Sequence, residues 1–179
     1  MRSLKRHESE KLFAKLSKYL GAQTAAVHEV DGEKWVFRVH KKKIFYLRAD
    51  LEKTIAQINK KNLISVGCCV ARITHNNNIR IVVTALHLLA ANAPTKFWVK
   101  PNQEQAFLYG NNVTRNGLGR ISDAALQHQG CVVYSMGDIP LGFGVTAQST
   151  AQSRRSESNA IALFHEADIG EYIRNEDGL

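Results

Sequence analysis

Residues 107–120 of the chain read FLYGNNVTRNGLGR, which combines three glycines, three asparagines and two arginines with the aromatic Tyr109. Glycines free backbone amides to approach a ligand closely, and arginine and amide side chains can donate hydrogen bonds to phosphate oxygens. An aromatic ring offers a face on which an unpaired base can stack. The stretch therefore has the parts needed to hold an RNA backbone. The alternative is a glycine-rich corner within a β-barrel.

Candidate RNA-binding residues can be named from this stretch and from one other place. The stretch itself supplies Tyr109, Gly110, Asn111, Asn112, Arg115, Gly117, Gly119 and Arg120. The second place is the Ser-, Gln- and Ala-rich segment 147–159, which we expect to be an exposed loop and which holds Arg154 and Arg155. The alternative for that pair is two solvated arginines.

The surrounding sequence predicts an α+β protein with two domains. Nine of the twelve glycines follow Pro94, and short β-rich runs separated by glycine corners favour a small β-barrel there. Before Pro94, apolar residues at helical spacing over 12–20 and three short strands within 27–47 predict a mixed α/β domain. Because proline ends helices, we place the boundary at 92–94, giving domains 1–94 and 95–179.

Charge is distributed unequally between the two halves. The net charge of the chain is +8, but residues 1–94 hold 17 Lys and Arg against 7 Asp and Glu, whereas residues 95–179 hold 7 against 9. Such an excess points to a polyanionic partner. The Lys41, Lys42 and Lys43 cluster is therefore a further RNA-binding candidate, with a solvated surface turn as the alternative.

The sequence contains no motif for a familiar catalytic or metal site. The seven histidines have no HxxxH or HExxH spacing, and there is no P-loop or GxSxG elbow. Three cysteines without CxxC spacing argue against a disulfide framework or a zinc ribbon. No apolar run approaches the length of a membrane span. We expect no catalysis, no cofactor, no metal and no membrane partner.

Several ordered motifs resemble the Nip-seven family of large-ribosomal-subunit biogenesis factors, which occurs in eukaryotes and has archaeal relatives. They extend over essentially the whole chain, and the most specific lie at 97–101 (FWVKP), 107–111 (FLYGN), 117–121 (GLGRI), 133–136 (VYSM), 138–145 (DIPLGFGV) and 167–172 (ADIGEY). The resemblance implies an N-terminal α/β domain and a C-terminal PUA domain, a pseudo-barrel that binds structured RNA. It places the family's helix and glycine turn at 107–120.

The resemblance also implies a non-catalytic role in pre-rRNA processing and 60S assembly in the nucleus and nucleolus. The implied partners are large-subunit pre-rRNA and other nucleolar assembly factors, with the chain as a monomer within the pre-ribosome. Two departures stand out: the first helix opens with Lys5, Arg6 and His7 instead of Thr and acidic residues, and the PUA half has a net charge of −2. Two alternatives remain open, an RNA-modifying enzyme (or its specificity subunit) and a protein-interaction adaptor.

Overall fold

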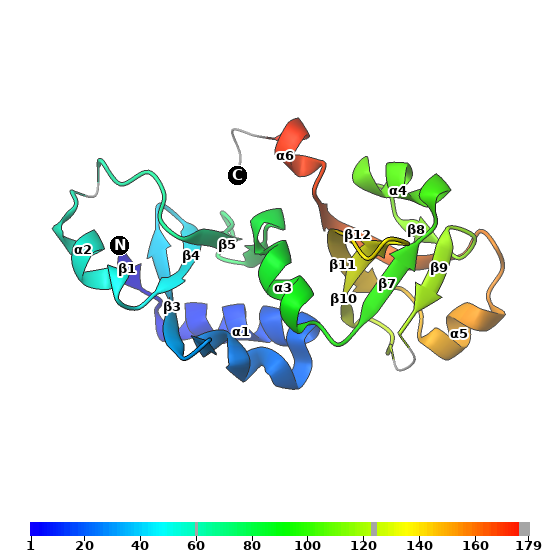
Figure 1. Cartoon of the computed structure of the whole chain (residues 1–179), viewed down its shortest axis with the longest axis horizontal. Helices are drawn as coiled ribbons and strands as arrows, with labels where there is room; N and C mark the ends of the chain where they lie inside the picture. The colour runs from blue at the N-terminus through cyan, green and yellow to red at the C-terminus, as the bar shows by residue number, and fades with distance from the viewer. Residues whose placement is uncertain (60, 123–124, 176–179) are drawn as a thin grey trace. The chain divides into compact units, whose positions relative to one another are not determined.

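The structure, a computed structural model, describes residues 1–59, 61–122 and 125–175 and divides them into two compact units. The first unit comprises residues 1–17 and 22–85, and the second comprises residues 18–21 and 86–175 (Figure 1). None of the helices in these described ranges is both long and apolar enough to pass through a bilayer.

The first unit is built on one antiparallel sheet with strand order β1-β3-β4-β5-β6, and β2 pairs with β3 at the side of this path. Its elements are β1 (Arg2–Ser3), α1 (Arg6–Leu20), the 3-10 helix η1 (Gly21–His28), β2 (Glu29–Val30), β3 (Glu33–His40), β4 (Lys43–Arg48), α2 (Leu51–Gln57), β5 (Cys68–Ile73), β6 (Ile79–Ile81) and the 3-10 helix η2 (Val83–Ala85).

The two faces of this sheet bury different clusters. Successive strand residues point to opposite faces. Phe37 pairs with Tyr46, the neighbour of Phe45, so Phe37 and Phe45 lie on different faces of the sheet. Phe37 packs edge-on against Phe13 of α1, with ring centroids 5.7 Å apart. Phe45 belongs to a cluster with Leu47 and with Ile55 of α2. Helices α1 and α2 therefore cover opposite faces.

The second unit is a six-stranded sheet with strand order β8-β12-β11-β10-β7-β9. Only the β7–β10 pair is parallel among these described strands. Its elements are α3 (Leu86–Asn92), β7 (Lys96–Val99), α4 (Pro101–Leu108), β8 (Val113–Thr114), β9 (Leu118–Ile121), β10 (Gly130–Ser135), β11 (Pro140–Thr146), α5 (Thr150–Arg155), β12 (Ile161–Asp168) and α6 (Glu171–Arg174).

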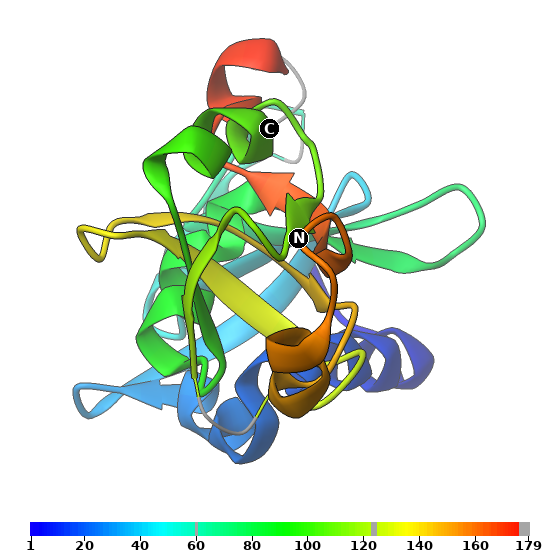
Figure 2. The same cartoon turned by 90° about the vertical axis from the view of Figure 1, so that its right-hand side faces the viewer.

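The sheet of the second unit curls into a nearly closed barrel because its two edge strands follow one another in sequence. The turn of residues 115–117 leads from the edge strand β8 directly to the other edge strand β9. Helices α4 and α5 lie on opposite sides of the barrel (Figure 2). The mixed α/β unit and the β pseudo-barrel confirm the fold class expected from the sequence.

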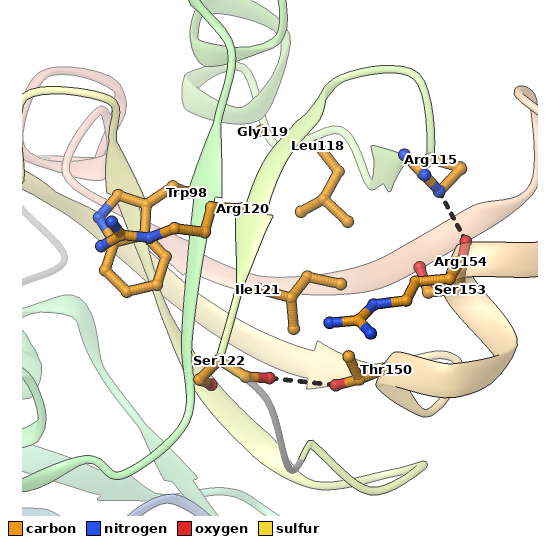
Figure 3. Close-up of a pocket in the computed structure, with 10 residues that line it drawn as sticks. All are labelled: Trp98, Arg115, Leu118, Gly119, Arg120, Ile121, Ser122, Thr150, Ser153 and Arg154. Atoms are coloured by element: carbon orange, nitrogen blue, oxygen red, sulfur yellow. Dashed lines mark hydrogen bonds between the residues drawn. The ribbon is translucent and has the colours of Figure 1, made fainter.

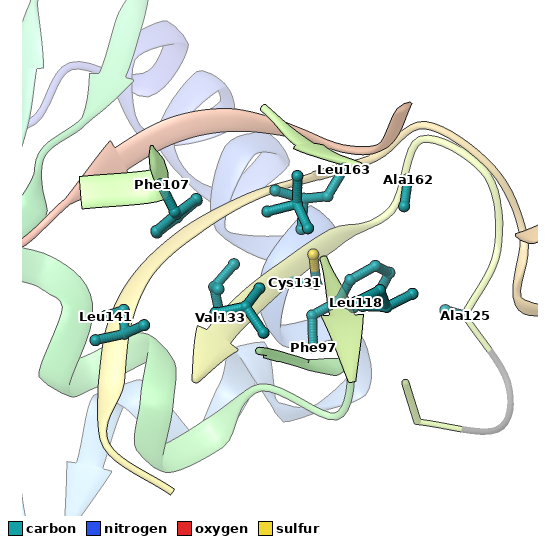
Figure 4. Packing of buried hydrophobic residues seen from close by; sticks show 11 residues of the cluster. Phe97, Phe107, Leu118, Ala125, Cys131, Val133, Leu141, Ala162 and Leu163 are labelled. Carbon is teal, nitrogen blue, oxygen red and sulfur yellow. The ribbon is translucent and has the colours of Figure 1, made fainter. Parts of the chain in front are cut away.

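Apolar side chains from most of the barrel strands fill its interior (Figure 4). Phe97, Phe107 and Leu163 are among the largest of these fully buried side chains. The barrel wall needs glycine on β11, since a Cβ at Gly142 would meet the carbonyl oxygen of Ala167 and one at Gly144 would meet that of Phe164. This close approach of β11 to β12 accounts for the alternation of glycine around Phe143.

The exposed loop expected over 147–159 is wrong for part of that segment. Residues 150–155 form the helix α5, which begins with a capping box: the Ser149 hydroxyl accepts from the Gln152 amide, and the Gln152 side chain accepts from the Ser149 amide. Thr150 and Ser153 of this helix are buried. The polar composition of the segment reflects capping of a short helix as well as exposure to solvent.

Candidate nucleic-acid interface

The second unit carries a pocket of about 500 Å³ lined by residues from β7, β9 and α5 and from the turn before β9 (Figure 3). Three of its lining residues are the arginines Arg115, Arg120 and Arg154, and none of the described lining residues is acidic. Guanidinium groups carry five donors in a planar fork and match the geometry of phosphate oxygens. The pocket is therefore suited to an anionic ligand.

A row of aromatic and basic side chains crosses three strands beside this pocket. The register places Arg120 opposite Trp98, and Trp98 opposite Tyr134. The guanidinium carbon of Arg120 lies 3.7 Å from the centre of the Trp98 ring, and the Trp98 and Tyr134 rings stack with centroids 5.8 Å apart. The Lys96 ammonium lies 5.5 Å from the Tyr134 ring. The guanidinium of the exposed Arg120 thus lies over the aromatic side chains (Figure 3).

Polar contacts fix Trp98 and Tyr134 within the row. The Trp98 Nε1 donates to Asp138 Oδ1 over 2.6 Å, and the Tyr134 hydroxyl donates to the carbonyl of Ala90 over 3.2 Å. Burial, reinforced by the nearby Asp138 charge, raises the pKa of Tyr134, so its hydroxyl stays protonated as a donor. The platform beneath Arg120 is thus rigid before any ligand arrives.

Helix α5 forms the other wall of the pocket and is tied to β9 and its preceding turn. Arg115 Nε donates to the carbonyl of Ser153 over 2.6 Å, and Thr150 Oγ1 donates to the carbonyl of Ser122 over 3.1 Å. Arg154 extends from α5 toward Ile121 and Thr150 (Figure 3). Ser153 Oγ is buried and has no hydrogen-bond partner among the described residues, which leaves a hydroxyl for a ligand in the pocket lining.

Four of the sequence candidates lie away from the pocket, at the end of α4. Tyr109 is 69% exposed, and Gly110 after it has a φ of +88°, which turns the chain away from the helix. Asn111 Nδ2 donates to the carbonyl of Ala106, and Asn112 Oδ1 accepts from the amide of His165. The amide groups of both asparagines therefore hold the barrel together, and Tyr109 is the exposed ring of this group.

The remaining candidates of the second unit divide between the pocket and its surroundings. Gly119 lines the pocket, whereas Gly117 is buried against the Gln103 side chain of α4. Arg155 is exposed on α5 and does not line the pocket. The structure thus brings Arg115, Gly119, Arg120 and Arg154 together, although Arg120 and Arg154 are far apart in sequence.

The lysine cluster lies in the first unit, at the tight turn between β3 and β4. Lys41 and Lys42 are the two turn residues, with φ angles of +46° and +63°, and Lys43 begins β4. Two-residue hairpin turns of this kind normally use Asn-Gly, so lysine carries a conformational cost here. Lys41 and Lys42 line a second pocket of about 500 Å³, which also contains Arg2, Lys5 and His7.

Sequence reasoning did not anticipate Trp98, Thr150 or Ser153 in the site. Trp98 belongs to the FWVKP motif but was not predicted to lie in the site, because its pairing with β9 crosses α4 and β8 and leaves no local pattern. For Thr150 and Ser153 a local signal did exist. Ser149 followed three residues later by Gln152 is the spacing of a capping box, and it could have indicated α5.

Comparison with known proteins assigns the family. The family model of the NIP7/UPF0113 pre-PUA domain matches residues 1–83, and that of the UPF0113 PUA domain matches residues 95–177. The 60S ribosome subunit biogenesis protein NIP7 homologue of Xenopus tropicalis is 46% identical over 179 residues, which cover 100% of this chain and 99% of the relative. The chain belongs to the Nip-seven (NIP7) family. The Mus musculus and Tetraodon nigroviridis NIP7 homologues are each 45% identical over the same shares of both chains.

Solved structures agree with the NIP7 assignment at the level of fold. A PUA-domain protein from Aeropyrum pernix K1, solved as a tartrate complex, superposes with a TM-score of 0.61 at 11% identity and covers 96% of this chain and 87% of its own. A hypothetical protein from Pyrococcus horikoshii OT3 gives a TM-score of 0.55 at 16% identity, covering 91% and 92%. The fold of the chain is therefore similar to that of these two proteins.

Proposed function

We propose that this chain is an RNA-binding assembly factor of the large ribosomal subunit and that it acts on pre-rRNA without catalysis. The observation that carries the proposal is the Arg120 guanidinium held on Trp98 beside Arg115 and Arg154, on a barrel of the PUA family. The relatives' names, which describe 60S ribosome subunit biogenesis proteins, support the process in which it works.

The pocket favours a segment of RNA in which bases are unpaired. A guanidinium plane that is stacked on one side can stack a base on the other, and its edges remain able to donate to phosphate. Arg154 and Arg115 then neutralise adjacent phosphates, while Tyr109, at the end of α4, supplies a second exposed ring. Shape and stacking are the means by which sequence-specific proteins read unpaired RNA.

A binding role fits the chemistry better than an enzymatic one. Burial raises the pKa of Cys68 to about 11 and also raises that of Cys69, so both thiols are protonated near neutral pH. Asp138 accepts a hydrogen bond from Trp98 and so has a structural task. No group of three metal-ligating side chains gathers in the described ranges. Large-subunit pre-rRNA and other assembly factors are the partners we propose, in the nucleolus of a eukaryotic cell.

Fluorescence anisotropy of the full chain with structured and single-stranded RNA tests this function. The Arg120→Ala and Arg154→Ala variants should each weaken RNA binding about tenfold, because each removes a charge-assisted contact. Arg6→Gln is the control. The Arg6 side chain is 94% exposed in the first unit, and Arg6 does not line the pocket of the second unit. Loss of affinity as large in the control as in the pocket variants would contradict a defined site. Wild-type affinity in both pocket variants would remove the site altogether.

A further inference from the structure

Four basic residues lie side by side across the sheet of the first unit. The strand register pairs His40 with Lys43, Lys43 with Arg72, and Arg72 with Arg80, on β3, β4, β5 and β6. Side chains of directly paired residues point to the same face, so these four form one row, which we call the basic row. Like charges placed directly opposite each other destabilise a sheet.

The basic row shares its face with the apolar cluster under α2. Lys43 and Phe45 are two residues apart on β4 and therefore lie on one face. At one end of the row His40 is buried, and its Nε2 donates to the carbonyl of Leu63 over 3.0 Å. At the other end Arg80 is exposed, and Lys43 and Arg72 are half-buried between them. The row thus passes from the protein interior to solvent.

Arg72 has an unsatisfied donor pair. Its Nε and Nη2 are buried and have no hydrogen-bond partner among the described residues. These two nitrogens form the side edge of the guanidinium, the fork that binds two oxygens of one phosphate or carboxylate at once. Buried donors of a charged group are seldom left unpaired, because their desolvation is then uncompensated. The fork is the part of the basic row that most needs an anionic partner.

The immediate neighbours of Arg72 do not supply that anion. Both residues directly opposite it, Lys43 and Arg80, are basic. The thiol of Cys69 shares a hydrogen bond with the Arg72 side chain, but it does not supply the anion. Burial raises the pKa of this thiol in spite of that bond and of the charges of Lys43 and Arg72, so it carries no negative charge at neutral pH. His40 also lines the Lys41 and Lys42 pocket, in which the acidic Glu8 is paired with Arg2.

We propose that the basic row is a phosphate-binding site, in which the Arg72 fork grips two oxygens of one phosphate with Lys43 and Arg80 on either side. The source of the phosphate, an RNA backbone, rests on the proposed function. Because the fork is turned into the protein, binding requires the half-buried Arg72 side chain to rotate toward exposed Arg80. That rotation exchanges two unpaired donors for a bidentate pair, so it is favoured once the anion is present.

Three variants of the full chain test the site. Arg72→Gln removes the fork and the charge, and Arg72→Lys keeps the charge without the fork. Lys34→Gln is the matched control. Lys34 is exposed at the other end of β3, and its separation of six residues from His40 places it on the same face of the sheet. The first measurement is the melting temperature in inorganic phosphate and in chloride at equal ionic strength.

The wild type and Lys34→Gln should melt higher in phosphate than in chloride. In Arg72→Gln the difference should shrink to the general stabilising effect of phosphate on folded proteins, which all variants share. In chloride it should melt at or above the wild type, since a like charge is removed from the row. Arg72→Lys should keep part of the difference. A full phosphate effect in Arg72→Gln overturns the site.

RNA titration identifies the source of the phosphate. With a short single-stranded RNA, Arg72→Gln should bind about three- to tenfold more weakly and lose about 0.7 from its log–log salt slope, while Lys34→Gln stays close to the wild type. A lost phosphate effect with unchanged RNA affinity would keep the phosphate site and reject RNA as its ligand. Loss of RNA binding on changing Arg120, with Arg72→Gln unaffected in both measurements, would keep the proposed function and reject this site.

Discussion

Arg120 on β9 lies directly opposite Trp98 on β7, and its guanidinium carbon sits 3.7 Å from the centre of the indole ring. The indole is itself held by Asp138 and stacked on Tyr134. An arginine immobilised in this way loses less conformational entropy on binding than one extended into solvent. The pair therefore places a positive charge at a fixed position on the outside of the barrel.

Replacing Arg120 by lysine separates charge from shape. Arg120→Lys keeps one positive charge but loses the planar stack and the fork, so RNA affinity should fall about fivefold while the free energy of unfolding falls by only ~0.5 kcal/mol. Anisotropy titration and urea unfolding measure the two quantities. Unchanged affinity would mean that the position contributes charge alone. Arg6→Lys, at an exposed position, is the control for the substitution itself.

Two substitutions of Asp138, which lies in a turn, should separate the effect of a lost hydrogen bond from that of backbone strain. Asp138 has a φ of +61° and accepts from Trp98 Nε1 over 2.6 Å. Asp138→Ala should lower the free energy of unfolding by about 2 kcal/mol, from the lost bond and the left-handed backbone together. Asp138→Gly should cost about 1 kcal/mol less, since glycine accepts this φ. Equal losses in urea unfolding would show that strain contributes nothing.

Acid should weaken the first unit through Glu8. Two hydrogen bonds from Arg2, at 2.6 Å each, lower the pKa of Glu8 from 4.5 to about 2. A carboxylate whose pKa is lowered in the folded state stabilises the fold when the pH is above the pKa that the group has in the unfolded chain. The contribution of Glu8 is therefore complete above about pH 4.5 and is lost as the pH falls toward 2. Because nearly half of the Arg2 side chain is exposed, we expect only about 1 kcal/mol.

Glu8→Gln isolates that pH dependence. The variant should unfold at lower urea concentration than the wild type at pH 6 and converge with it near pH 2. Glu10→Gln is the control, because the Glu10 side chain is 65% exposed in its pair with Arg6. Parallel stability curves for wild type and Glu8→Gln across this range would contradict the assigned pKa.

The domain boundary at 92–94 stays a prediction, and two fragments of the second unit can test it. Helix α3 lies between the two family matches, and its Leu89 is fully buried in that unit. The carbonyl of Ala90 also receives the Tyr134 hydroxyl. A fragment beginning at Leu86 should therefore be about 2–4 kcal/mol more stable than one beginning at Thr95, from the leucine side chains that α3 buries. Equal stability in urea would support a boundary at 94.

Local patterns predicted much of the fold, whereas the site depended on pairing that the sequence does not display. Apolar spacing over 12–20 indicated α1, and the glycine-rich corners indicated the barrel. The sequence did not predict Trp98 as a site residue, because its partner Arg120 lies 22 residues later, beyond a helix and another strand. The basic row escaped for the same reason, since His40, Arg72 and Arg80 become neighbours only through register.

The candidates at the end of α4 stay predictions, and the structure gives two of them a second task. Asn111 and Asn112 have the chemistry of RNA ligands, but their amides complete the hydrogen bonding of α4 and β12. Side-chain type alone cannot distinguish a donor for a ligand from a donor for the backbone, since both tasks use the same groups. Four other candidates, Arg115, Gly119, Arg120 and Arg154, line one pocket, which the sequence alone did not show.

Tyr19 belongs to the second unit, where its ring packs edge-on against Phe143 with centroids 5.4 Å apart and its hydroxyl donates to Glu166. The two ends of that hydrogen bond are 147 residues apart in the chain. During synthesis, the barrel therefore cannot complete its packing until Glu166 has left the ribosome, long after Tyr19 has emerged. Contacts of such long range slow folding and prolong the exposure of apolar surface. In a nascent chain, Tyr19 and its apolar neighbours would therefore be open to chaperones until Glu166 is available.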